Sequence, residues 1–147
     1  MRSSGSKYQK ISCSDFSLMR FIGIDLGRRS TGIAVSEGKF AQPYTTITHA
    51  NTKEAQEKVA KLIKSLNGQK VVIGYVEGKI AKLFGNFASG LKKKMPNIDI
   101  ILHDETLTSR QAQDTMIKLG IGKFRRRKKE HEIAAAIILQ SYLQSND

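Results

Sequence analysis

Short apolar runs occupy the first part of the chain, and turn residues separate them. Residues 20–25, 30–36 and 40–48 each have the length and the apolar or β-branched content of a strand. The links between these runs are too short for a crossover connection. Pro43, in the third run, is typical of an edge strand or a bend. This part of the sequence therefore predicts an antiparallel meander of three strands.

A helical period replaces the strand pattern after residue 50. Apolar residues then recur every three or four positions, and two short, wholly apolar runs lie between the helical segments. The predicted helices are 52–66, 79–94, a segment capped by Thr106, Thr108 or Ser109 that ends at Leu119, and 130–143. The predicted buried strands are 71–74 and 98–102. The full order predicts an α/β fold: a mixed five-stranded sheet, with an antiparallel meander of three strands plus two parallel strands, flanked by helices.

Composition is consistent with one domain that has a basic surface. The chain has 147 residues, and its 25 Lys and Arg outnumber its 13 Asp and Glu, which gives a net charge of +12. A charge this large favours a polyanionic partner such as nucleic acid, although a basic surface can also serve solubility alone. The single cysteine excludes an internal disulfide, and no apolar run has the roughly 20 residues of a membrane span. We therefore expect a cytoplasmic protein with no membrane partner.

The start of the chain is rich in serine and lacks an apolar pattern. We expect residues 1–18 to form a flexible arm, native or left over from expression, and residues 19–147 to form the folded domain. Met19 stands directly before the first strand and is a candidate natural start. A serine-rich, basic leader is also typical of organelle transit peptides, so import into an organelle is the alternative to a cytoplasmic location.

Asp25 is the strongest candidate for chemistry. It stands near the end of the first strand, between Gly23 and Gly27, where the backbone can be approached closely. A carboxylate inside a buried strand is costly unless it is paired or bound to a metal. The alternative role is to cap the following turn. We predict that Asp25 is a metal ligand in a site that acts on phosphodiesters.

Two further groups are expected near Asp25. Glu105 follows the end of the second parallel strand, and ligands of open α/β sheets gather at the carboxyl ends of such strands. His131 lies in the first turn of the last helix, which the small residues at 134–136 allow to pack tightly on the sheet. The alternative for Glu105 is a first-turn carboxylate that the helix dipole favours. The alternative for His131 is a solvated polar residue at the start of the helix. Together these groups would hold Mg²⁺ or Mn²⁺, and two such ions could clamp the oxygens of a phosphodiester.

A dense basic run precedes the last helix. Its members are Lys123, Arg125, Arg126, Arg127, Lys128 and Lys129. Beside an acidic metal site, we expect this run to hold a phosphate backbone without reading its sequence. A solvated charged loop or a targeting signal would have the same composition.

Two further residues are candidates for contact with nucleic acid. Tyr75 stands at the end of the first parallel strand and could stack on a base or a ribose, with packing in the core as the favoured alternative. Thr108 could touch phosphate as well as cap a helix.

Four stretches carry a resemblance to a known family. They are FIGIDLG at 21–27 with TGIAVS at 31–36, VVIG at 71–74, DETLTS at 104–109, and the basic run leading into AAAIIL at 134–139. In this order and spacing, the sequence resembles the YqgF/RuvX family, whose members are named Holliday junction resolvases and pre-16S rRNA nucleases. The resemblance covers residues 19 to about 145. It implies an RNase H-like fold with a metal-assisted phosphodiesterase site.

The acids that are usual in this family map onto the chain with one departure. The first aspartate corresponds to Asp25 and the glutamate to Glu105, but the third acid, an aspartate that opens the last helix, falls on His131. The imidazole could bind a metal or accept a proton. Glu132 could take the place of the missing acid if the helix turned by about 100°.

The resemblance and the residues together predict an endonuclease that acts on structured nucleic acid. Processing of the 5′ end of pre-16S rRNA is favoured over resolution of Holliday junctions. The main alternative is a nucleic-acid-binding homologue that has lost catalysis with the change at position 131. Sugar kinases and ATPases with related folds are not favoured, because the chain is too short for their two-lobed cleft. The partner is pre-rRNA or branched DNA, and the protein is a monomer or the homodimer that a junction enzyme would need.

Overall fold

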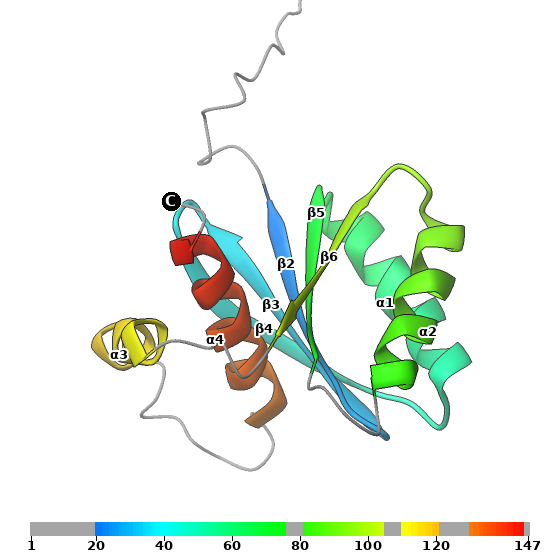
Figure 1. The fold of residues 1–147 in the computed structure, drawn as a ribbon, viewed down its shortest axis with the longest axis horizontal. Helices are drawn as coiled ribbons and strands as arrows, with labels where there is room; N and C mark the ends of the chain where they lie inside the picture. Colours follow the sequence, from blue (N-terminus) through cyan, green and yellow to red (C-terminus); the bar gives the residue numbers. More distant parts are fainter. Residues whose placement is uncertain (1–19, 76–80, 105–109, 121–129, 146–147) are drawn as a thin grey trace, which may run out of the picture.

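A mixed five-stranded sheet forms the centre of the molecule (Figure 1). The structure is a computed structural model that describes residues 20–75, 81–104, 110–120 and 130–145. The strands are β2 (Phe21–Leu26), β3 (Ser30–Glu37), β4 (Phe40–Thr48), β5 (Lys70–Tyr75) and β6 (Asp99–Asp104). The helices are α1 (Thr52–Leu66), α2 (Ala81–Lys94), α3 (Arg110–Lys118) and α4 (Glu130–Ser145). All the elements predicted from the sequence are present, with ends shifted by a few residues.

The directions of the strands confirm the predicted meander with two parallel strands added. The order is β4-β3-β2-β5-β6. β3 runs antiparallel to both β2 and β4, whereas β5 runs parallel to both β2 and β6. The register places Asp25, Gly74 and His103 in one row across β2, β5 and β6. The carboxyl ends of the three parallel strands therefore meet at one edge of the sheet, which we call the carboxyl edge.

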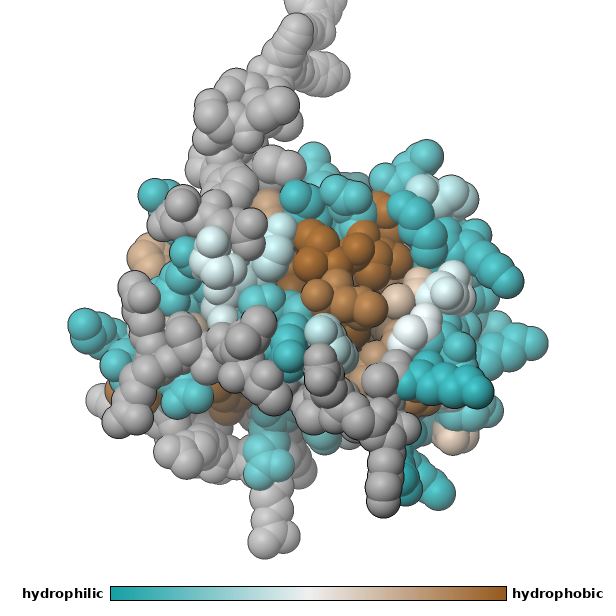
Figure 2. All heavy atoms as spheres, viewed as in Figure 1, coloured by the Kyte–Doolittle hydropathy of each residue, from teal (hydrophilic) through white to brown (hydrophobic). Residues whose placement is uncertain are grey.

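The two outer strands of the sheet are both edge strands. β4 carries Pro43 and has an irregular register opposite Ile33 and Ala34, in keeping with the prediction of an edge strand there. The prediction that residues 98–102 form a buried strand is wrong, because β6 is the last strand of the sheet and Leu102 is 45% exposed. An apolar run is fully buried only where other elements cover both of its sides, and β6 pairs with β5 alone. Figure 2 shows apolar side chains gathered over β6, on the side toward α2.

Helices cover both faces of the sheet (Figure 1). α1 and α2 cover one face, and the strand residues beneath them include Ile22, Ile24, Ile33 and Ile73. α4 covers the other face, with α3 beside it, and the strand residues beneath α4 include Phe21, Ala34 and Val72. Because side chains alternate along a strand, Asp25 shares the α4 face with Phe21 and Gly23. In the described ranges, no helix is both long enough and apolar enough to span a membrane.

The ends of α1 follow from local sequence. Asn51 Oδ1 accepts a hydrogen bond from the Glu54 backbone N–H at 2.8 Å, and Glu54 Oε1 accepts one from the Ala50 N–H at 2.9 Å. The Asn51 cap satisfies a first-turn donor of the helix, and Glu54 bonds the N–H of the residue before the cap rather than that of the cap itself. At the other end, Asn67 adopts a left-handed conformation with φ of 54° and bonds the last-turn carbonyls. α1 thus returns the chain from the end of β4 to the start of β5, at the edge opposite the carboxyl edge.

Candidate active site

Asp25 contacts His131 at the carboxyl edge of the sheet. Asp25 Oδ2 lies 3.1 Å from His131 Nδ1, and the two side chains are 16% and 40% exposed. Burial raises the pKa of Asp25, while the hydrogen bond and the charge of His131 lower it in part. The contact with His131 therefore offsets only part of the cost of burying the Asp25 carboxylate. A bound cation at this point would supply the missing compensation.

Glycines on the strands allow α4 to bring His131 to Asp25. Gly32 lies directly opposite Asp25 on β3, and a Cβ at Gly32 would overlap the His131 carbonyl and the Glu132 backbone nitrogen. A Cβ at Gly23 would approach Leu139 Cβ to 2.7 Å. Any side chain at these two positions would hold the helix away from the sheet. The position of the His131 side chain is therefore set by contacts between backbones.

Glu132 faces a different strand from Asp25. Its Oε2 accepts a hydrogen bond from Thr46 Oγ1 of β4 at 2.9 Å. β3 lies between β4 and the strand that carries Asp25. For Glu132 to take the place of a missing acid, it would have to leave Thr46. In this structure His131, not Glu132, is the helix residue that reaches Asp25.

Several predicted site residues lie outside the described residues. They are Glu105, Thr108, Lys123, Arg125, Arg126, Arg127, Lys128 and Lys129. Glu105 is the next residue after Asp104, which ends β6 at the carboxyl edge. The predictions for these positions stay predictions.

The donors around Asp25 fit a divalent metal ion. In the described ranges, no group of three His, Cys, Asp or Glu side chains comes together, so Asp25 and His131 form the described part of the site. A carboxylate that burial keeps under-compensated is a suitable ligand for Mg²⁺ or Mn²⁺. The imidazole makes the pair less suited to Mg²⁺, which prefers oxygen ligands, than to a first-row transition metal.

Tyr75 and His103 lie near the carboxyl edge but have other contacts. Tyr75 packs against the core beneath α1 and α2, on the face of the sheet opposite Asp25. This matches the packing role that the sequence favoured for Tyr75, and its contact with nucleic acid stays a prediction. His103 Nε2 lies 3.2 Å from Ser141 Oγ of α4, and burial lowers the pKa of His103. Neither side chain contacts Asp25.

Sequence reasoning missed Arg28, Arg29 and Thr46. Both arginines are exposed in the turn between β2 and β3, three and four residues after Asp25. Their signal was available, because two cations beside a candidate acid suggest phosphate binding. Thr46 had no such signal. Its contact with Glu132 joins residues 86 positions apart, which only the fold brings together.

Comparison with known proteins identifies relatives over nearly the whole described chain. The family model for RuvX, described as Holliday junction resolvase, matches residues 19–145. A protein of Shouchella clausii is 36% identical over 135 residues, covering 85% of this chain and 94% of its own. A protein of Porphyromonas gingivalis is 35% identical over 138 residues, covering 87% of this chain and 98% of its own. Both carry the provisional name pre-16S rRNA nuclease.

Two resolvases are among the solved structures with a similar fold. Thermus thermophilus RuvC in complex with a Holliday junction substrate superposes with a TM-score of 0.61 at 13% identity, over 87% of this chain and 95% of that one. The fowlpox virus resolvase in its complex with Holliday junction DNA gives a TM-score of 0.58 at 15% identity, over 87% and 99%. At these identities the likeness shows the fold alone, which is RNase H-like as the sequence predicted.

Proposed function

The chain belongs to the RuvX family of nucleases, and from this premise we propose that it is a divalent-metal-dependent endonuclease that processes the 5′ end of pre-16S rRNA. The observation that carries the proposal is the contact between Asp25 and His131 at the carboxyl edge. The choice of substrate rests on the relatives, which are named for pre-16S rRNA and are 32–36% identical over most of the chain.

The proposed metal site has three protein groups. Asp25 and His131 converge in the structure, and Glu105, from the segment after β6, is the proposed third. These groups would hold Mg²⁺ or Mn²⁺. When bound, the ion lowers the pKa of water to form a nucleophile and stabilises the leaving oxygen.

Side chains of the protein would position the phosphate and supply positive charge around it. Asp25 stands on a rigid central strand, so its carboxylate keeps a fixed position relative to a phosphate at the carboxyl edge. His131 Nδ1 faces Asp25, so Nδ1 is the ring nitrogen placed to share an ion with the Asp25 carboxylate. Arg28 and Arg29, exposed beside Asp25, and the basic run 123–129 would hold the phosphates on either side of the cleaved bond.

Cleavage of labelled RNA tests this proposal. A precursor of 16S rRNA and a four-way DNA junction are incubated with the protein, side by side, in Mn²⁺ and in chelator. We expect metal-dependent cutting of the precursor, and a rate at least about 100-fold lower for Asp25→Asn. Asp99→Asn is the matched control, because Asp99 is exposed at the other end of the sheet. Cutting by Asp25→Asn at the wild-type rate would refute the assignment.

The junction arm of the same experiment separates the substrates. If the protein cut the junction and not the precursor RNA, the proposed substrate would be branched DNA instead of pre-16S rRNA. Binding without cutting would leave the third ligand in question, and His131→Asp, which restores the usual acid, would then be tested. Recovery of cutting in His131→Asp would show that the fold is an intact nuclease scaffold.

A further inference from the structure

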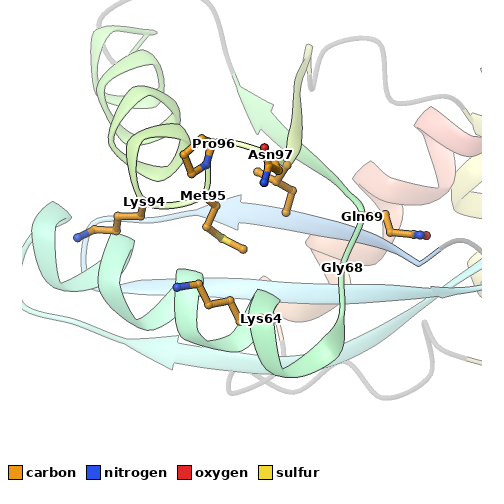
Figure 3. Close-up of a pocket in the computed structure, with 8 residues that line it drawn as sticks. Lys64, Gly68, Gln69, Lys94, Met95, Pro96 and Asn97 are labelled. Carbon is orange, nitrogen blue, oxygen red and sulfur yellow. The ribbon is translucent and has the colours of Figure 1, made fainter.

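A basic groove lies on the outer surface of α1 and α2. A pocket of about 430 Å³ forms where the two helices end, and Lys64 and Lys94 stand at its rim (Figure 3). A neighbouring pocket of about 620 Å³ also includes Lys64 and Lys94 and extends along α1 past Lys61 to Lys58, where Glu54 and Glu57 line it as well. We call the surface lined by Lys58, Lys61, Lys64 and Lys94 the lysine groove.

Small residues between the two helices create the groove. Gly90 of α2 lies so close to Gln56 of α1 that a Cβ at Gly90 would overlap the Gln56 side chain. One turn further along each helix, Ala60 takes the place of Gln56 and Lys94 that of Gly90. Because Ala60 is small, the surface is hollow at this level, and Lys94 extends along its rim.

Positive charge is least compensated at the end of the groove that carries Lys64 and Lys94, because Glu54 and Glu57 line its other end. Lys58 pairs with Glu54 at 2.9 Å, so it contributes little net charge. Lys61, Lys64 and Lys94 are exposed, and none of them forms an ion pair with another described residue. Figure 3 shows Lys64 and Lys94 extending from neighbouring helices toward the same side of the pocket. None of the described residues that line that pocket is a carboxylate. Three ammonium groups therefore share one open surface.

Lys64 and Lys94 lie at the edge of the sheet opposite Asp25, whereas Lys58 lies nearer the carboxyl edge, where its Nζ donates to the Thr48 carbonyl. β5 leads the chain to the carboxyl edge and α2 returns it to the opposite edge. Lys94, the last residue of α2, therefore lies near the start of β6, where Lys70 of β5 pairs with Asp99. The six residues of β2 span roughly 20 Å between these edges. A group held at Lys64 and Lys94 is therefore too distant to take part in chemistry at Asp25.

We propose that the lysine groove is a second binding surface for the phosphodiester backbone of double-helical nucleic acid, separate from the site at Asp25. This inference rests on the proposed function, because it takes the polyanion that binds this basic chain to be a nuclease substrate. A double helix rises about 3.4 Å per base pair, so only a substrate with more than about six base pairs can reach both places. Lysines contact phosphates as point charges and read no sequence, so the surface selects substrates by size and structure.

A structural role of these lysines makes a different prediction. Lys64 and Lys94 stand in the last turns of α1 and α2, where cations interact favourably with the helix dipole. If that were their whole role, removing them would lower the stability of the protein and leave binding unchanged.

Binding of a 20-base-pair hairpin tests the proposal, with the full chain in chelator so that no cutting occurs. An RNA hairpin and a DNA hairpin of the same sequence are titrated by fluorescence anisotropy at several salt concentrations. For Lys64→Gln/Lys94→Gln we expect about tenfold weaker binding in 0.1 M salt, and a plot of log K against log salt that is less steep by about 2. Lys39→Gln/Lys118→Gln is the matched control, since both lysines are exposed on other faces and the net charge falls equally.

The outcomes decide between the roles. Weaker binding and the smaller salt slope in the groove variant alone support the proposal, for RNA, DNA or both according to the hairpin affected. If the control variant lost as much affinity for the hairpin as the groove variant, the proposal would be overturned, because binding would then depend on the total charge and not on the groove. Unchanged binding would overturn it as well, and with a lower urea midpoint it would assign the lysines to the helix dipole.

Failure of the inference and failure of the proposed function give different results. The hairpin assay measures binding without metal, and the cleavage assay measures chemistry at Asp25. A protein that cuts no RNA but needs the groove to bind would refute the nuclease and keep the groove. A protein that cuts precursor RNA, and whose groove variant binds the hairpin as well as the wild type does, would support the nuclease and refute the groove.

Discussion

Gly32 determines how closely α4 approaches Asp25. A methyl group at this position would overlap the backbone of His131 and Glu132, so Gly32→Ala must push the start of the helix away from the sheet. We expect the free energy of unfolding to fall by about 1–3 kcal/mol, as overpacking of a core does. We also expect cleavage to fall by more than the loss of folded protein explains, because His131 would leave Asp25. Urea unfolding and the cleavage assay measure the two effects.

Gly85→Ala is the matched control for this change. Gly85 lies within α2, and a Cβ there would meet no atom within 4 Å. An alanine inside a helix is more favourable than a glycine by about 0.5–1 kcal/mol, so this variant should be slightly more stable and equally active. If both variants lost activity alike, the contact of Gly32 with α4 would not explain the site.

His49 makes stability depend on pH. It is 6% exposed, its Nε2 lies 2.8 Å from Thr31 Oγ1, and burial lowers its pKa. The unfolded chain therefore binds a proton at His49 more readily than the folded protein does. The stabilisation that neutral His49 provides is present above the ordinary value near 6.5 and is lost as the pH falls below it toward the lowered pKa. We expect the free energy of unfolding to decrease between pH 7.5 and pH 5.5.

Comparison with His49→Gln isolates this contribution. Glutamine can still bond Thr31 but does not titrate, so the decrease between the two pH values should be smaller in the variant. Burial lowers the pKa of His103 too, and His103→Gln measures that separate contribution. An unaltered pH dependence in His49→Gln would assign the effect to other groups.

At the scale of single residues, sequence reasoning identified the partners that have unusual chemistry. Asp25 was noticed because a carboxylate in an apolar strand is costly, and His131 because it opens the last helix beside a basic run. Gly32 and Thr46 were not identified as partners of α4, since nothing in the local sequence shows which helix packs over a strand residue. Their importance depends on what the fold places next to them.

The element that positions the site is α4, and Gln140 ties it to the hairpin between β3 and β4. Gln140 is 1% exposed, accepts a hydrogen bond from the Ala41 N–H at 2.8 Å and donates one to the Lys39 carbonyl at 3.2 Å. Gln140→Leu would fill the space but leave the buried Ala41 N–H without its partner. We expect the free energy of unfolding to fall by about 1–3 kcal/mol in urea.

Gln113→Leu serves as the control, because Gln113 is an exposed residue of α3. Its effect on stability should lie within about 0.5 kcal/mol. A stability of Gln140→Leu equal to that of the wild type would mean that water satisfies Ala41 after the change.

Elements were predictable where their signals are local. α1 was placed correctly because its cap, its apolar stripe and its left-handed end all lie within its own sequence. β6 was misjudged, because an apolar run shows that a strand can be buried, but not whether it lies at the centre or the edge of the sheet. That depends on the strand order, which only long-range pairing determines.

For the whole molecule, binding of a metal should raise thermal stability. A ligand that binds only the folded protein stabilises it, by about 1.4 kcal/mol at ten times its Kd. For a chain of this size, that corresponds to a rise in Tm of roughly 3–6 °C. Because the pair contains an imidazole, we expect a larger rise in Mn²⁺ than in Mg²⁺. Differential scanning calorimetry measures both.

Variants connect this rise to the site. Asp25→Asn should abolish the rise, and Asp99→Asn should keep it. His131→Asp should bring the effect of Mg²⁺ up to that of Mn²⁺, since all described ligands would then be oxygens. A rise that persists in Asp25→Asn would locate the metal elsewhere.

The fold as a whole was predictable because several signals agree. The short links, the change of period and the glycine exits all favour one arrangement of three antiparallel and two parallel strands, and the sheet has that arrangement. The total charge predicted a polyanionic partner. It did not predict the lysine groove, because the groove joins α1 and α2 residues that are 30 positions apart, such as Lys64 and Lys94.

The contact at Gly32 also bears on how this protein can evolve. The atoms nearest to a Cβ at Gly32 are backbone atoms of α4, so this contact does not depend on the side chain that position 131 carries. If position 131 holds the ion as proposed, a single substitution there would exchange one ligand for another without a compensating change in the core. Relatives of this chain could then differ in metal preference while the scaffold remains constant.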